Sequence, residues 1–250
     1  MTTAATATAN TSKAPPPFGA CDKAFLAKLR DAGQDAPVIF DIGGSNGWWS
    51  RTMLDIYPES RYELFEPLAG RRKEYDDSLR TALAEHGNFS VHPVALGDRE
   101  GQADFWNEPN GVGSSLLVGS TPADQRIVVP VRRLDGLVAE LKLPQPQIIK
   151  VDVQGSEDQV IRGGQETFAA ADILLLETWL RRGYGKATPL LTELIDMLVP
   201  MGFLLVDVGD FYRKPDQELI SIDAFFAHRR CIERLTSRGA QLPWRGFWEG

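Results

Sequence analysis

Short apolar runs alternate with longer stretches in which apolar residues recur every three or four positions. A short apolar run predicts a buried strand, and a period of three to four residues predicts an amphipathic helix. Strands that alternate with helices form a parallel sheet with helices on both faces, so the pattern predicts an α/β fold. The expected parallel strands cover residues 38–40, 61–65, 89–96, 147–153 and 173–176.

The last two apolar runs break this alternation. Residues 202–208 and 221–227 both read as strands, and only a charged loop lies between them. A connection without a crossover helix joins antiparallel strands. The sheet is therefore expected to end in an antiparallel hairpin.

Capping residues predict where several helices begin. Asp22 is expected to cap the first helix, Ser156 and Gln159 have the spacing of a capping box, and Thr188 precedes Pro189 as cap and first-turn residue. The side chains expected to be buried on the helices are Phe25, Leu26 and Leu29; Trp48, Thr52, Met53 and Ile56; Tyr75, Leu79 and Leu83; and Leu190, Leu191, Leu194, Ile195 and Leu198.

Two segments lie outside the alternation. Residues 1–18 are rich in Ala and Thr and offer too little apolar surface to offset the entropy of ordering, so we expect a disordered tail. Residues 102–106 and 127–131 predict two extra strands joined by a long polar loop, within an insertion of about residues 99–133. Residues 19–250 then suit one α/β domain.

A glycine turn follows the first strand. Asp41 leads into Gly43, Gly44 and Gly47, and glycine is needed where φ is positive or where a ligand lies against the main chain. The alternatives are the dinucleotide pattern G-x-G-x-x-G, the acidic-x-Gly-x-x-x-Gly turn of S-adenosylmethionine (SAM) enzymes, and an ordinary βα turn. The spacing of Asp41, Gly43 and Gly47 matches the SAM turn and not the dinucleotide pattern.

A second acidic residue stands where a ribose would bind. Glu66 follows the second strand about 20 residues after the glycines, where a carboxylate can accept hydrogen bonds from ribose hydroxyls. A solvated charge at a strand end is the alternative. Ligands of doubly wound sheets lie at the carboxyl ends of the strands, so Ala95, Leu96 and Asp98 are expected to border the adenine.

Composition restricts the classes of function. A net charge of −7 argues against nucleic acid as the main partner, because phosphate binding needs a basic face. No apolar run reaches the ~18 residues of a membrane span, and the N-terminus lacks the signal-peptide pattern. Cys21 and Cys231 are too few for a disulfide framework and have no metal-ligand spacing. We therefore expect a cytoplasmic protein with reduced thiols.

From about residue 38 to residue 229 the chain resembles the FkbM family of SAM-dependent methyltransferases. The matching segments are FDIGGSNGWWS, LFEP, VALGD, NGVGSSL, VVPVRRLD, IIKVDVQGSE, LLLET and SIDAFFAHR. The resemblance implies the Rossmann-like class I methyltransferase fold, SAM as cofactor, and O-methylation of sugars or specialised metabolites. The residues expected at SAM are Asp41, Gly43, Gly44, Ser45, Gly47, Glu66, Pro67, Ala95, Leu96 and Asp98.

Two positions depart from the family's pattern. The family usually has asparagine where this chain has Ser45, with Asn46 one place later, which changes a hydrogen-bond partner for the methionine end of SAM. It usually has an acid where this chain has Gln154. The loss of that charge leaves the identity of any metal ligand unknown.

Carboxylates are the candidate catalytic groups. Methyl transfer from a sulfonium needs an aligned acceptor oxygen and removal of the hydroxyl proton. Asp152 closes the fourth strand, and Lys150 precedes it by two residues on the same strand face, so that Asp152 is expected to act as a base or to hold Mg²⁺. Glu177 and Glu157 complete the candidate set, although Glu157 also suits the first turn of a helix. The three histidines are expected to be structural or exposed.

Two loops are expected to form the acceptor pocket, one at residues 209–219 and one at residues 110–115, together with the end of the fifth strand. The residues expected there are Asn110, Ser114, Ser115, Trp179, Phe211, Tyr212 and Arg213. The C-terminal aromatic residues Trp244, Phe247 and Trp248 are expected to form either a lid or a homodimer contact.

The expected function is transfer of a methyl group from SAM to a small-molecule hydroxyl. The alternatives are a catalytically silent binding protein, suggested by Gln154 and Ser45, and a methyltransferase for another class of acceptor. An NAD-linked oxidoreductase is disfavoured by the glycine spacing.

Overall fold

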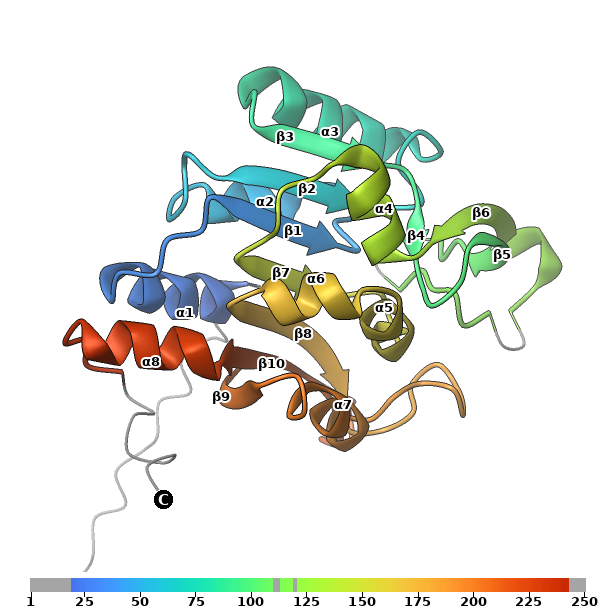
Figure 1. Cartoon of the computed structure of the whole chain (residues 1–250). Coiled ribbons are helices and arrows are strands. Elements are labelled where there is room, and N and C mark those ends of the chain that lie inside the picture. The colour runs from blue at the N-terminus through green and yellow to red at the C-terminus, as the bar shows by residue number, and fades with distance from the viewer. Residues whose placement is uncertain (1–18, 110–112, 119–120, 243–250) are drawn as a thin grey trace, which may run out of the picture.

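The computed structural model describes residues 19–109, 113–118 and 121–242. Within these residues a seven-stranded sheet has the order β3-β2-β1-β7-β8-β10-β9 (Figure 1). Its strands are β1 (Val38–Ile42), β2 (Arg61–Phe65), β3 (Phe89–His92), β7 (Ile148–Val151), β8 (Ile173–Trp179), β9 (Phe203–Arg213) and β10 (Leu219–His228). The expected disordered tail, Asn110 and the C-terminal aromatic cluster lie outside the described residues.

Helices cover both faces of this sheet (Figure 1). One face packs against α1 (Ala20–Asp31), α2 (Trp48–Met53), α3 (Lys73–Glu85) and α8 (Arg229–Ser237). The other packs against α4 (Leu134–Leu141), α5 (Glu157–Gly163), α6 (Gln165–Ala170) and α7 (Leu191–Leu198). Successive side chains of a strand point to opposite faces, so β1 sends Ile39 to the first core and Phe40 to the second.

The directions of the strands confirm the expected fold class. β3, β2, β1, β7 and β8 are parallel neighbours, whereas β10 lies antiparallel between β8 and β9. The result is a mostly parallel sheet that ends in an antiparallel hairpin. No helix among the described residues is long and apolar enough to cross a membrane.

Pro93 divides the single strand expected at residues 89–96. β3 ends at His92, while β4 (Ala95–Leu96) joins β6 (Arg126–Arg132) and β5 (Gly101–Trp106) in a second, small sheet. Proline has no N–H for a strand ladder, which explains the break. A short 3₁₀ turn, η1 (Ala123–Gln125), precedes β6. The two extra strands of the insertion are confirmed, and their sheet lies beyond the ends of β1 and β2 (Figure 1).

The terminal hairpin is longer than the pattern predicted. β9 continues to Arg213 and β10 begins at Leu219, so most of the expected loop at residues 209–219 is strand. The pairing shifts register at several points along the hairpin. Such irregularities bend and twist a strand pair, which hides the strand from a simple alternation pattern.

Two of the predicted helix caps are wrong because other contacts occupy their side chains. Gly19 caps α1, while Asp22 lies inside the helix and accepts a 2.7 Å hydrogen bond from the indole of Trp49. Ser156 occupies the predicted N-cap position of α5, although its side chain makes no capping hydrogen bond. Leu190 caps α7, and the Thr188 hydroxyl accepts from the Tyr184 N–H instead.

Two of the predicted buried stripes also need correction. Trp48 is 38% exposed and Leu83 is 43% exposed, whereas their neighbours Trp49 and Ala82 are buried. Only this end residue of each stripe is wrong, since Met53, Tyr75 and Leu79 are buried as predicted.

Candidate functional site

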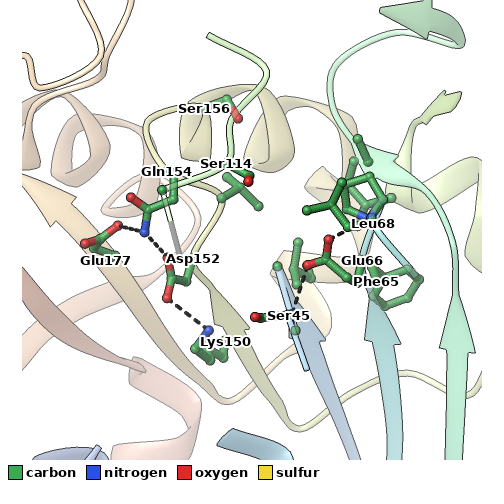
Figure 2. A pocket seen from close by; sticks show the side chains of 18 of the residues that line it. Ser45, Phe65, Glu66, Leu68, Ser114, Lys150, Asp152, Gln154, Ser156 and Glu177 are labelled. Atoms are coloured by element: carbon green, nitrogen blue, oxygen red, sulfur yellow. Dashed lines mark hydrogen bonds and ion pairs between the residues drawn. The ribbon is translucent and has the colours of Figure 1, made fainter. Parts of the chain in front are cut away.

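A cavity of about 630 Å³ lies where β1, β2, β7 and β8 end. This volume is within the ~300–1,000 Å³ that is usual for small-molecule sites. Figure 2 shows Glu66 on one side of the cavity and a chain of polar side chains from Lys150 to Glu177 on the other. We call these the Glu66 side and the Asp152 side.

The glycine turn after β1 forms part of the wall. Gly43, Gly44 and Ser45 line the cavity, and the Gly43 N–H donates to the carbonyl of Phe65. Gly43 has φ 75°, and a Cβ there would stand 1.8 Å from the carbonyl oxygen of Asp152. Glycine is therefore required at position 43 because the chain leaving β7 passes directly against it.

Glu66 joins the glycine turn to the end of β2. Its Oε2 accepts a 2.9 Å hydrogen bond from the Ser45 N–H, and its Oε1 accepts one of 2.8 Å from the Leu68 N–H. The side chain is buried in the cavity wall, and burial raises its pKa to about 7 although the two N–H groups oppose the rise. Pro67, Ala95 and Leu96 also line the cavity.

Three of the expected SAM residues do not reach the cavity. Asp41 lies behind the glycine turn, where its Oδ2 accepts a 2.6 Å hydrogen bond from Ser50 and its Oδ1 is 3.6 Å from the Lys150 ammonium. Gly47 begins α2, and a Cβ there would approach a leucine of α3 to 3.0 Å. Asp98 faces outward and pairs with Arg162 at 3.2 Å.

The Asp152 side is built by the turn after β7. Asp152 Oδ2 is 3.3 Å from Lys150 Nζ. The Gln154 amide nitrogen donates two hydrogen bonds of 2.8 Å, one to Asp152 Oδ1 and one to Glu177 Oε2 (Figure 2). The hydroxyl of Tyr184 in turn donates to Gln154 Oε1 at 2.6 Å.

Carboxylates outnumber cations on this side. Lys150 is almost fully buried; burial alone would lower its pKa, but the charges of Asp152 and Asp41 raise it overall. Burial and the neighbouring Asp152 raise the pKa of Glu177 well above its usual value. Burial, followed by the charge of Asp22, raises the pKa of Asp223 to about 8.

Glu157 does not lie in the cavity. It is fully buried, and its Oε1 accepts hydrogen bonds from the N–H groups of Val153 and Gly155. Burial raises its pKa to about 7. The structure thus places Glu157 as a brace for the turn that carries Asp152, and not among the groups that face the cavity.

Some of the residues expected at the acceptor line the cavity, and others do not. Ser114, Trp179 and Tyr212 line the cavity. Ser115 is buried and donates to the carbonyl of Gln154. Phe211 and Arg213 do not line the cavity, and the guanidinium of Arg213 lies over the ring of Phe211.

The sequence patterns did not single out several residues of the cavity wall. Ser221 and Asp223 lie two residues apart on β10, opposite Trp179 and Glu177 of β8. Both residues lie on a predicted strand, and residues two apart on a strand point to the same face. This spacing was the signal that could have placed them together. Tyr184 comes from the connection between β8 and α7, and no local pattern reports its contact with Gln154.

The expected Mg²⁺ finds no support. Among the residues that the structure describes, no three His, Cys, Asp or Glu side chains form a group suited to a metal ion. None of the histidines lines the cavity. His92, for example, contacts Glu63 at 2.7 Å.

Comparisons with known proteins find a methyltransferase family and methyltransferase relatives. Residues 41–205 match the model of the methyltransferase FkbM domain. The chain is 33% identical over 181 residues to the 2-O-methyltransferase NoeI of Sinorhizobium fredii, covering 65% of this chain and 71% of that protein. It is 25% identical over 160 residues to methyltransferase 1 of Beauveria bassiana, covering 56% of this chain and 64% of that one.

Solved structures include a similar protein under the same family name. The crystal structure of methyltransferase FkbM from Methylobacillus flagellatus superimposes with a TM-score of 0.47 at 16% identity. The match covers 76% of this chain but only 43% of that one. This chain therefore spans less than half of that protein.

Proposed function

Because this chain belongs to the FkbM family of methyltransferases, we propose that it transfers the methyl group of SAM to a hydroxyl oxygen of a small molecule. The activity named for the 33% identical relative, a 2-O-methyltransferase, supports oxygen as the acceptor atom. A sugar or a specialised metabolite is the acceptor class we propose.

The observation that carries this proposal is the pairing of Glu66 and Asp152 across one cavity. The residues on the Glu66 side fit SAM. Each Glu66 oxygen accepts one backbone N–H, and a carboxylate oxygen has a further lone pair for a ribose hydroxyl. Phe65, Leu68 and Leu96 supply apolar surface for an adenine ring.

Bound SAM supplies an electrophilic methyl group on a sulfonium. The chain's own groups bind the acceptor and move its proton. Asp152 lines the cavity, and its Oδ2 lies 3.3 Å from the ammonium of Lys150. We assign it the role of general base, which takes the proton from the acceptor hydroxyl as the oxygen attacks.

Aromatic side chains suit the acceptor. Trp48, Trp179 and Tyr212 line the cavity, and aromatic faces can stack on a sugar or another ring. Their apolar ring surfaces can also exclude water from the reacting groups.

The proposal is tested by incubating the protein with radiolabelled SAM and a panel of methyl pyranosides as hydroxyl probes. Transfer of label to a probe oxygen, identified by mass spectrometry, is the expected result. A protein that binds SAM but labels no hydroxyl compound, including those of a crude metabolite pool, would instead be the silent binding protein. Label on nitrogen or carbon would identify another acceptor class.

A further inference from the structure

Gln154 is the centre of a hydrogen-bond network in the cavity wall. Its amide nitrogen donates to Asp152 and to Glu177, both at 2.8 Å (Figure 2). An amide nitrogen has two donor hydrogens, so both are used. One side chain thus connects the proposed base to a second carboxylate, which also lies 3.5 Å from the Ser221 hydroxyl.

The orientation of the Gln154 amide is fixed from its other end. Tyr184 donates its hydroxyl to Gln154 Oε1 at 2.6 Å, and its hydroxyl oxygen also lies 3.1 Å from the carbonyl of Gly113. A hydroxyl donor facing the amide oxygen leaves the NH₂ group to face the two carboxylates. A flipped amide would set its oxygen against Asp152 and Glu177, which are acceptors.

The backbone of Gln154 is held in an uncommon conformation. Gln154 has φ 58°, and of the four non-glycine residues with positive φ in the described chain, two, Ser45 and Gln154, line the cavity. Positive φ is costly for residues with a Cβ, and such residues often occur at functional sites. The hydroxyl of Ser115 donates to the Gln154 carbonyl at 2.7 Å and helps to hold this conformation.

We propose that Gln154 is a positioning residue for methyl transfer: its amide, oriented by Tyr184, fixes the carboxylate of Asp152 toward the acceptor and holds Glu177 beside it. The proposal rests on the proposed function. It assigns a role to the glutamine that replaces the family's usual acid. The amide satisfies both carboxylates without adding a third negative charge.

The hydrogen bonds from the Gln154 amide also affect the electrostatics of the carboxylates beside it. Burial and the charge of Asp152 raise the pKa of Glu177, and the hydrogen bond from the Gln154 amide opposes that rise. The other charged or titratable groups around them are Lys150 on β7, Asp41 on β1, Asp22 on α1, Glu157 on α5, Asp223 on β10, and Tyr184. Without the amide, acidic neighbours predominate around Glu177, and protonation of Glu177 becomes easier.

The test compares Gln154→Ala, Gln154→Asn and Tyr184→Phe with the wild type. Asparagine tolerates positive φ and keeps an amide, but it is one methylene shorter and cannot reach both carboxylates as glutamine does. Gln159→Ala is the matched control, since Gln159 lies on α5 outside the cavity wall. SAM binding is measured by calorimetry, and turnover is measured on a methyl pyranoside that the wild type methylates.

For Gln154→Ala we expect kcat to fall about 10²-fold, while the Kd for SAM stays within about twofold. In Gln154→Ala, the acidic limb of the plot of kcat against pH should move to higher pH. Tyr184→Phe should move this limb in the same direction, but by a smaller amount. Gln154→Asn should remain impaired despite its amide. The control should behave as the wild type.

A readout without SAM separates positioning from a loss of folding. The melting temperature of Gln154→Ala, relative to the wild type, should fall more at pH 8 than at pH 5, because the carboxylates repel most when ionised. Wild-type kcat and an unmoved pH profile in both Gln154 variants would overturn the inference. Failure of the wild type to methylate any probe would instead count against the proposed function.

Discussion

The carbonyl oxygen of Asp152 lies against Gly43, so close that a Cβ on this glycine would stand 1.8 Å from it. The turn after β1 and the turn after β7 are therefore packed backbone to backbone. This contact places the glycine turn and Asp152 at one cavity.

Gly43→Ala should lower the free energy of unfolding by about 2–4 kcal/mol, since overpacking costs about 1–3 kcal/mol and positive φ adds about 1 kcal/mol. Urea unfolding measures the loss. Gly70→Ala is the matched control, because Gly70 has φ 76° but a Cβ added there would meet no other atom within 4 Å. It should lose only about 1 kcal/mol. Equal losses in the two variants would contradict the close contact.

Glu66→Gln should weaken SAM binding by roughly 10- to 100-fold, because a hydrogen bond to a charged group contributes about 1.5–3 kcal/mol. Calorimetry measures the change. Glu63→Gln is the control: Glu63 is a buried carboxylate of the adjoining strand β2, but it contacts His92 and lies outside the cavity wall. If both variants bind SAM as the wild type does, Glu66 is not the ribose ligand.

The ligand-free protein should lose stability as pH rises from about 4 to 8. Burial raises the pKa of Glu66 and Glu157 from 4.5 to about 7 and that of Asp223 from 3.8 to about 8. In this window the folded state binds more protons than the unfolded state, so the free energy of unfolding falls with pH. Thermal melting across the window checks the sign, and a flat or rising curve would contradict it.

Asp152→Asn should lower kcat by about 10²- to 10⁴-fold and leave the Kd for SAM within a few fold, because only proton removal is lost. Rates from single-turnover experiments measure this. Asp98→Asn should change neither value, since Asp98 faces outward and pairs with Arg162. EDTA should leave the wild-type rate unchanged if Asp152 acts directly as the base. Wild-type turnover in Asp152→Asn would move the role to Glu177.

Tyr212→Ala should raise the acceptor KM by about two- to tenfold, since loss of one aromatic stacking contact costs about 0.5–1.5 kcal/mol. Phe211→Ala is the adjacent control. Phe211 is 64% exposed and lies outside the cavity wall, so its removal should leave KM unchanged. The reverse pattern would show that the hairpin faces the acceptor differently.

Local patterns predicted the elements better than the contacts between them. β2 has the predicted bounds, and the extra strands and the antiparallel hairpin are where the apolar runs placed them. Ser45, Glu66 and Asp152 meet at one cavity because the carboxyl ends of parallel strands share an edge. The roles of these residues stay predictions.

Misses that concern single side chains share a physical cause. The local sequence around Asp22 predicts a helix cap, but its carboxylate accepts a hydrogen bond from the indole of Trp49 instead. Asp41 has the motif spacing of a ligand residue, yet Ser50 and Lys150 hold it behind the turn. Tyr184 carried no motif and still reached Gln154. Long-range partners decided each case, and spacing along the chain does not encode them.

The position of β10 between β8 and β9 has a consequence for how the chain folds during synthesis. β8 pairs with β7 on one edge and with β10 on the other. The edge that faces β10 therefore stays unpaired until residues 219–228 have been translated. Its residues Ile173, Leu174, Leu175 and Leu176 are apolar, and an exposed apolar edge is a site of aggregation. A nascent chain stalled before β10 should therefore depend on chaperones, and the last strands complete the sheet as it leaves the ribosome.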